Sequence, residues 1–242
     1  MIVRELGAYL AAHPFLIPLM LVSAALVYLL LRVQVSLREH AAAEMQRLLA
    51  VNPAQALERL DNNRRLATVF RKPILTLWRL DAAMAMGDDA LARETLDALS
   101  AMRLEPNDRL EYYQKGISFY AESGDGENAR RLRDALIAFL AKGRLLETEP
   151  YADIAREADT IIGVYIDHDT ALIKKLIGRA EHTKNDVMRG ICQYRVAKLA
   201  WFKGDEDLMR TYLNRAEKNL KDTLYASVIA EARDNPAILE TK

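Results

Sequence analysis

The stretch QKGISFYAESGDGENA, from Gln114 to Ala129, decides the fold of this 242-residue chain. The segment Asp108–Ala121, just before the pair Gly124-Asp125, has apolar residues at the spacing of an amphipathic helix. A second helical pattern begins directly after that pair, and glycine is a common stop signal for a helix. The stretch therefore predicts two helices joined by a short turn, which is an α-helical hairpin.

Similar turns recur along the chain after residue 32, and nearly every segment between them has the periodicity of an amphipathic helix. The turns are Asn52-Pro53, Gly87-Asp88, Gly124-Asp125, His168-Asp169 and Gly204-Asp205, spaced 35, 37, 44 and 36 residues apart. A period of about 33 to 40 residues with two helices per unit is typical of a helical solenoid. We expect a solenoid of about four or five hairpins.

Similarity between the units supports this period. The sequence LIGRAE at Leu176–Glu181 recurs as YLNRAE at Tyr212–Glu217, 36 residues later. Positions five and twelve residues after each of the last four turns are apolar, and residues seven apart lie on one helix face. These positions are Ala92, Ala129, Ile173 and Met209, and Leu99, Leu136, Ala180 and Ala216. Each unit thus has a face that can pack against the preceding helix.

This pattern resembles the tetratricopeptide repeat, in which the first helix ends in a Gly-Asp type of turn, small residues follow at five and twelve positions, and a proline closes the unit. The stretch Gln114–Ala129 is the closest match. Pro73, Pro106 and Pro150 stand just before the first helix of the next unit, where a missing N–H costs little. The resemblance covers about residues 38 to 220 and implies a TPR-like α-solenoid.

The sequence also departs from the repeat. The small residue of the first helix is replaced by Leu80, Ile117 or Ile161 and is present only at Ala197. The unit between the third and fourth of the five turns is longer than the others, because its turns lie 44 residues apart.

A long apolar run precedes the repeats. From Pro14 to Leu31 the sequence PFLIPLMLVSAALVYLLL has no charged side chain. About 20 apolar residues in a helix cross a hydrocarbon core about 30 Å thick, so the run is long enough to be a transmembrane helix. A cleaved signal peptide and a buried core helix are the alternatives. The small-residue site Ala41-Ala42-Ala43 is separated from the run by charged residues, which disfavours cleavage there.

Basic residues on either side of the run predict its orientation. Arg4 precedes it, whereas Arg32, Arg38 and Arg47 follow it, and basic residues concentrate on the cytoplasmic side of a membrane. We expect a single-pass protein of the cell membrane with a cytoplasmic C-terminal domain. Because no glycine or proline interrupts Leu19–Val51, we expect the helix to continue from the membrane into the first hairpin.

The expected fold class is all-α, with five parts along the chain. They are a short N-terminal segment (1–13), a transmembrane helix (14–31), a helix that continues into the first hairpin (32–51), the TPR-like repeat array (52–221) and a capping helix with a tail (222–242). The capping helix would shield the apolar face of the last repeat.

The composition argues against several functional classes. The 34 basic and 34 acidic residues balance and are interspersed, whereas dedicated nucleic-acid binders usually carry a net basic charge. The single cysteine, Cys192, permits no intramolecular disulfide and no cysteine-rich metal knuckle. The four histidines form no metal-type pair, and no phosphate-binding loop or nucleophile elbow is present. We therefore expect no catalytic residues, no metal, no cofactor and no nucleic-acid partner.

In tetratricopeptide arrays the first helix of each repeat lines a concave groove, so the resemblance implies a partner site on that face. The residues that the family pattern turns toward the groove are Trp78, Lys115, Ser118, Arg195, Lys198 and Trp201. Aromatic rings supply apolar area there, and basic side chains can hold peptide carboxylates. Simpler interpretations exist: the tryptophans can be core residues, and the basic residues can form a solvated face.

These features favour a membrane-tethered, non-enzymatic adaptor or scaffold that binds a protein or peptide partner at the membrane surface. Tethering raises the effective concentration of partners on that surface, so modest affinity is enough. The first alternative is a permanent structural or assembly subunit of a larger membrane complex. The second is an enzyme whose site carries no recognisable motif.

Overall fold

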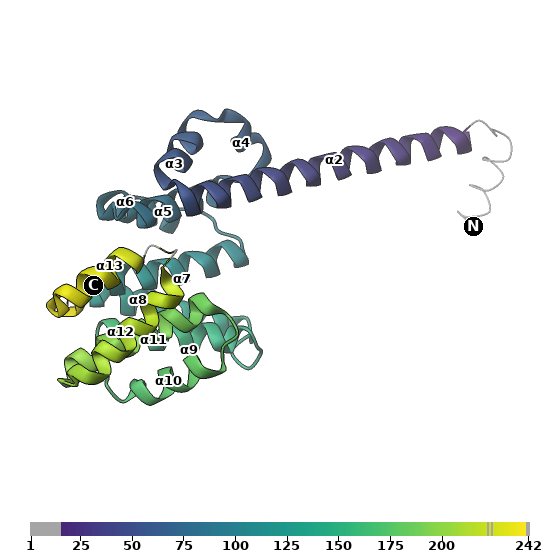
Figure 1. The fold of residues 1–242 in the computed structure, drawn as a ribbon. Coiled ribbons are helices and arrows are strands. Elements are labelled where there is room, and N and C mark those ends of the chain that lie inside the picture. The colour runs from purple at the N-terminus through teal and green to yellow at the C-terminus, as the bar shows by residue number, and fades with distance from the viewer. Residues whose placement is uncertain (1–15, 222, 224, 241–242) are drawn as a thin grey trace. The chain divides into compact units, whose positions relative to one another are not determined.

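The computed structural model describes residues 16–221, 223 and 225–240 (Figure 1). All regular secondary structure within these residues is helical, which confirms the predicted all-α class. The chain divides into two compact units, Met1–Gly87 and Asp88–Lys242. The expected N-terminal segment and the first two residues of the expected transmembrane helix lie outside the described part of the chain.

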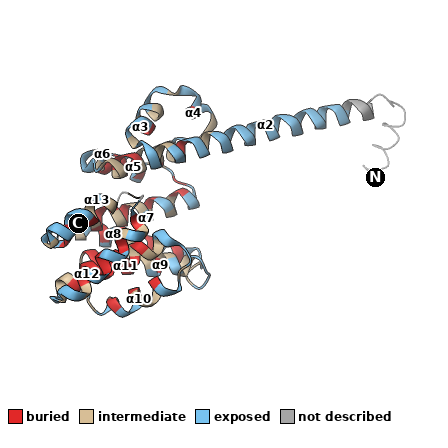
Figure 2. Ribbon diagram, in the orientation of Figure 1, coloured by how far each residue is buried: buried red, intermediate tan, exposed pale blue. Residues whose placement is uncertain are grey.

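The first unit begins with α2, an uninterrupted helix of 36 residues from Leu16 to Val51. Among the described residues, α2 alone is long and apolar enough to span a membrane, and its apolar window is not buried within the chain. Its large apolar side chains from Met20 to Leu37 are each more than half exposed, and Figure 2 shows α2 as exposed over most of its length. One helix therefore joins the apolar run to the folded part of the first unit.

The remaining helices of the first unit pack around the C-terminal end of α2. They are α3 (Pro53–Asn62), α4 (Arg64–Val69) and α5 (Lys72–Met86). Met45 of α2, Ala56 of α3 and Leu66 of α4 form a buried core, against which Leu48, Leu49, Phe70 and other apolar residues pack. The Asn52 side chain accepts a hydrogen bond from the Gln55 backbone N–H at 3.1 Å, which caps α3. The end of α2 is thus part of a folded core.

The second unit has eight α-helices and one 3-10 helix in its described residues. They are α6 (Asp89–Ser100), α7 (Pro106–Glu122), α8 (Gly126–Lys142), α9 (Tyr151–Tyr165), α10 (Leu172–His182), α11 (Asp186–Lys203), α12 (Glu206–Leu220), α13 (Tyr225–Asp234) and η1 (Pro236–Glu240). From α6 to α13 each helix lies near the next in the chain, and the strongest packing is that of α11 on α12.

The first helices of successive hairpins also lie side by side. Besides the contacts within the α7/α8, α9/α10 and α11/α12 pairs, α7 contacts α9, and α9 contacts α11. α13 contacts α12, and η1 returns to α11. The adjoining surfaces of α7, α9 and α11 therefore bring together segments that are well separated in the sequence.

The Gly-Asp pairs mark helix ends where the sequence predicts turns. Gly87, Gly124 and Gly204 have φ angles of 68°, 76° and 76°, the left-handed conformation that ends a helix and that glycine adopts without strain. The following aspartate caps the next helix; the Asp205 carboxylate accepts a hydrogen bond from the Leu208 N–H at 3.1 Å. At the fourth turn His168 takes the left-handed conformation, with φ of 51°.

Candidate functional site

A cluster of polar side chains is buried where α7, α9, α11 and α13 meet. We call it the inner cluster and define it by Glu122 of α7, Glu157 and Tyr165 of α9, Tyr194, Arg195 and Lys198 of α11, and Tyr225 of α13. The exposed fractions of Arg195 and Lys198 are only 6% and 1%. Burying a charge is costly unless it is paired and hydrogen-bonded, so these two cations require partners inside the protein.

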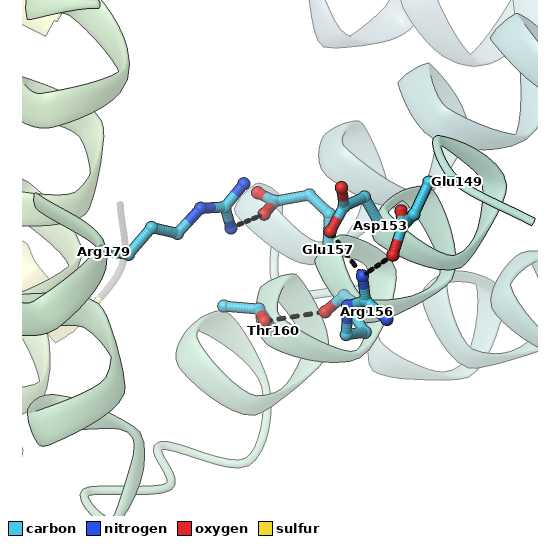
Figure 3. Close-up of polar contacts among 6 residues, drawn as sticks. All are labelled: Glu149, Asp153, Arg156, Glu157, Thr160 and Arg179. Atoms are coloured by element: carbon cyan, nitrogen blue, oxygen red, sulfur yellow. Dashed lines mark hydrogen bonds and ion pairs between the residues drawn. The ribbon is translucent and has the colours of Figure 1, made fainter. Parts of the chain in front are cut away.

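Glu157 is the main partner of the buried arginine. Arg195 Nη1 donates a hydrogen bond to Glu157 Oε1 at 2.5 Å. Arg179 of α10 donates to the other carboxylate oxygen, Glu157 Oε2, as Figure 3 shows. Burial alone would raise the pKa of Glu157, but Arg195 and then Arg179 lower it below its usual value. The carboxylate therefore stays ionised and links α9, α10 and α11.

A second set of ion pairs lies on the exposed side of the same helix. Arg156 donates hydrogen bonds to Asp153, at 2.7 Å, and to Glu149 (Figure 3). These side chains are all more than half exposed, so water screens their interaction. The two faces of α9 therefore carry similar ion pairs in very different surroundings.

The Lys198 ammonium is held by groups of another kind. Its Nζ donates a hydrogen bond to the backbone carbonyl of Leu239 in η1. It also lies 5.4 Å from the ring centroid of Tyr165 and 5.6 Å from that of Phe202, within reach of cation–π attraction. Burial lowers the pKa of Lys198 to about 8, against the opposing effect of Glu122. The ammonium is therefore bound by a carbonyl, lies near two aromatic rings and is favoured by the charges of Glu122 and Glu240.

The tyrosines and Glu122 complete the cluster. The Tyr225 hydroxyl donates a hydrogen bond to Glu122 Oε1 at 3.3 Å, and the rings of Tyr194 and Tyr225 lie 5.7 Å apart. Burial raises the pKa of Glu122, although Arg195 opposes this effect. Burial also raises the pKa of Tyr165 to about 12. Burial thus disfavours the charged forms of Glu122, Tyr165 and Lys198, whereas Glu157 and Arg195 remain charged because they pair with each other.

The 3-10 helix η1 covers the α11 side of the inner cluster. Leu239 is fully buried, and the Trp201 indole N–H donates a hydrogen bond to Glu240 Oε1 at 3.3 Å. Together with the bond from Lys198 to the Leu239 carbonyl, these contacts tie a segment near the C-terminal end of the chain to α11. Two of the residues expected to bind a partner, Lys198 and Trp201, are thus bound by this chain itself.

The six predicted partner-binding residues fall in three places. Trp78 lies on α5 in the first unit, where it packs edge-to-face on Phe70 at 4.7 Å beside the core of that unit. Lys115 and Ser118 are half-buried on α7, and Lys115 pairs with Glu111 at 3.3 Å. Arg195, Lys198 and Trp201 lie together on α11 and bind other groups of this chain. Their contact with a partner stays a prediction.

Sequence reasoning missed the acidic and tyrosine members of the cluster and the segment that covers it. One signal was available. In the stretch YRVAKLAWF, from Tyr194 to Phe202, Arg195 and Lys198 stand among apolar residues on all sides of the helix. A helix without a polar face is usually buried, so its charged residues must have partners inside the protein.

Other features of the described residues offer less to a ligand. A solvent-open hollow in the first unit is lined by Leu48, Gln55, Glu58, Arg59, Asn62, Asn63, Arg64 and Arg65. Within this hollow Arg59 is already paired with Glu44 of α2, through two hydrogen bonds of 2.5 and 2.7 Å. No group of three or more metal-ligating side chains gathers anywhere in the part of the chain that the structure describes. The inner cluster is therefore the candidate functional site.

Comparisons with protein-family models, with curated proteins and with solved structures found no match to this chain. The resemblance to tetratricopeptide repeats therefore stays a prediction that rests on the residues quoted above.

Proposed function

We propose that this protein is a membrane-tethered, non-enzymatic adaptor whose stacked helical hairpins bind a protein or peptide partner at the membrane surface. The observation that carries the proposal is the construction of α2. Its apolar side chains from Met20 to Leu37 are exposed, while its last turns, around Met45, belong to the core of the first unit. One end of α2 thus exposes apolar side chains that a bilayer could bury, and the other end packs in the core of the first unit. A helix of this kind can tether the folded part of the chain to a membrane.

The energetics of α2 support insertion into a bilayer. Soluble monomers rarely expose contiguous apolar patches larger than a few hundred Å². Full burial of each leucine or valine from Met20 to Leu31 contributes about 1.5–3 kcal/mol, and a hydrocarbon core would supply that burial. Since none of the apolar window is buried within the chain, the core-helix alternative is disfavoured. Cleavage at Ala41-Ala42-Ala43 would cut a helix that packs into the first unit, which disfavours the signal peptide.

The second unit supports the binding role. The inner faces of α7, α9 and α11 adjoin, as the first helices do in tetratricopeptide arrays. The excess of arginine after the apolar run supports a cytoplasmic location for both units. A partner already at the membrane would then meet the hairpins at a raised local concentration, and modest affinity would suffice.

Membrane fractionation tests the tether. The double variant Leu21→Arg, Leu26→Arg places two charges in the expected span, each costing about 2.5–3.5 kcal/mol at the centre of a membrane helix. We expect the wild-type chain to resist an alkaline carbonate wash and the double variant to be released. The matched control is Leu37→Arg, which adds a charge at an exposed apolar position of α2 beyond the expected span and should remain bound. Release of the wild-type chain by the wash would refute the tether.

Crosslinking in native membranes, followed by mass spectrometry, tests the adaptor. A partner recovered in sub-stoichiometric amounts and lost in high salt is the expected result. Stoichiometric partners that survive purification in mild detergent would instead favour a permanent subunit of a larger complex. Recovery of the chain alone, from membranes in which it is abundant, would count against both roles.

A further inference from the structure

The segment η1 contacts α11 through two polar bonds and contributes one buried apolar side chain. One apolar side chain, Leu239, is fully buried; its carbonyl accepts a hydrogen bond from Lys198; and the Glu240 carboxylate accepts one from the Trp201 indole. Grooves formed by helices recognise short peptides through this combination of an apolar anchor and fixed polar groups. The five-residue segment thus displays the chemistry that the face of α11 selects.

The segment is attached more weakly than the helices around it. η1 is a single 3-10 helix of five residues, and Leu239 is its only fully buried residue. Ala237 and Glu240 are exposed, and Pro236 and Ile238 are half-buried. Segments with few buried apolar contacts open at the lowest cost in a protein. The segment can therefore leave α11 without dismantling a hairpin.

The face of α11 beneath the segment carries two donors that bind its oxygen atoms, the Lys198 ammonium and the Trp201 indole N–H. Beside them, the buried Arg195 and Tyr165 side chains interact with each other, and Arg195 opposes the rise that burial causes in the pKa of Tyr165. Lys198 and Arg195 also lie 5.4 Å and 5.9 Å from the same Tyr165 ring, so two cations adjoin one aromatic face. The indole and ammonium donors suit carbonyl and carboxylate oxygens. The ligand chemistry is therefore that of an acidic peptide.

We propose that the inner face of α11 is a binding site for a partner segment with a leucine followed by an acidic residue, and that Pro236–Glu240 is an internal ligand that this partner displaces. The inference rests on the proposed adaptor function and names the class of partner. Because the internal ligand is joined to α13 within the same chain, its effective concentration at the site is of the order of millimolar. A free peptide should therefore bind the wild-type chain weakly.

The test uses the full chain in lipid nanodiscs and a fluorescein-labelled peptide, NPAILETK, with the sequence of residues 235–242. Fluorescence anisotropy reports its binding. The variant Leu239→Asp places a carboxylate at a fully buried position and should release the internal ligand. We expect the peptide to bind this variant about 30-fold more tightly than it binds the wild-type chain, because the site is no longer occupied.

Two controls isolate the site. Ala237→Asp makes the same change of charge at an exposed position of η1 and should leave peptide binding as weak as in the wild-type chain. Trp201→Phe, added to Leu239→Asp, removes the indole donor and should weaken peptide binding about 5-fold. A peptide with aspartate in place of its leucine should not bind.

Several outcomes would overturn the proposal. One is a Leu239→Asp chain that keeps its helical circular dichroism and melting transition but binds the peptide no more tightly than the wild-type chain. Another is loss of the fold in Leu239→Asp, which would make η1 an indispensable part of the core. These results leave the adaptor function standing if membrane crosslinking still finds partners. Conversely, tight peptide binding with no crosslinked partner would establish the site and refute the adaptor.

Discussion

Helices α2 and α11 are both rich in apolar residues, yet their surroundings are opposite. The apolar side chains of α2 from Met20 to Leu37 are exposed, whereas ten of the eighteen residues of α11 are buried, including a lysine and an arginine. α11 is enclosed because α9, α10, α12 and η1 all contact it, while α2 contacts α3 and α5 only near its end. Apolar sequence alone therefore does not decide which helix forms a protein core; the neighbours do.

Among substitutions that test the role of burial, the largest loss in the free energy of unfolding is expected at Glu157, which pairs with the buried Arg195. The substitution Glu157→Ala leaves that guanidinium buried without a compensating charge, and breaking a buried ion pair in this way costs about 3–5 kcal/mol. We expect a loss of about 3 kcal/mol in the free energy of unfolding. Urea unfolding of the detergent-solubilised chain, followed by circular dichroism, measures it.

The control for Glu157 lies just before α9. Glu149→Ala removes an exposed partner of Arg156, and exposed ion pairs contribute about 0–1 kcal/mol. Equal losses in the two variants would show that Arg195 finds water or another anion when Glu157 is gone. That result would contradict the inference that burial makes the Glu157–Arg195 pair more important for stability than the exposed Glu149–Arg156 pair.

A smaller effect is expected from the packing of α11 on α12. A Cβ atom at Gly190 would lie 2.5 Å from Leu220 Cγ and 3.0 Å from Asn219 Cβ, too close without a shift of α12. Overpacking of this kind costs about 1–3 kcal/mol, so Gly190→Ala should lower the free energy of unfolding by that amount. The matched control is Gly178→Ala in α10, where no atom lies within 4 Å. It should be neutral or stabilise the chain by up to about 1 kcal/mol.

The pH dependence of stability tests the burial of Lys198. Its pKa in the folded chain is about 8, below the ordinary value of 10.5, so the folded state binds fewer protons than the unfolded state between these values. Stability should therefore rise as pH increases from 8 to 10. Subtracting the curve of Lys198→Met from that of the wild-type chain removes the contribution of other groups. A flat difference curve would show that the ammonium is hydrated.

The smallest effect is expected on the exposed part of α2. Ser36 and His40 lie on the stretch between the apolar run and the core of the first unit, and both side chains are exposed. Ser36→Ala should change the free energy of unfolding by less than about 0.5 kcal/mol, because exposed substitutions away from caps and cores have little effect. A large loss, measured by the same urea unfolding, would reveal a contact of this stretch and weaken the comparison with α11.

Local features of the fold could be predicted from the sequence because their causes are local. The turns at Gly87, Gly124 and Gly204 depend on one left-handed residue and one capping aspartate, both visible in the sequence. The continuation of the apolar run into the folded part follows from the lack of helix breakers between Leu19 and Val51. Such interactions span a few residues, so spacing alone reveals them.

The burial of the predicted site residues could not be read in the same way. Arg195 is buried because Glu157, 38 residues earlier, pairs with it, and Lys198 because Leu239, 41 residues later, covers it. Helical periodicity shows which side chains share a face, but it does not show which distant segment lies on that face. The helical periodicity predicted a helix where α11 lies, but it could not show that η1 returns to this helix.

In the proposed membrane-tethered arrangement, the uninterrupted course of α2 would also set the distance of the first unit from the bilayer and its rotation about the helix axis. From Leu31 to Ala41, where packing against the core begins, the helix rises about 15 Å, at about 1.5 Å per residue. One residue inserted in this stretch would raise the unit by about 1.5 Å and turn it by about 100° around the helix axis. Seven residues would raise it by about 10 Å and turn it by only about 20°. Insertions of chosen length can therefore adjust reach and direction separately.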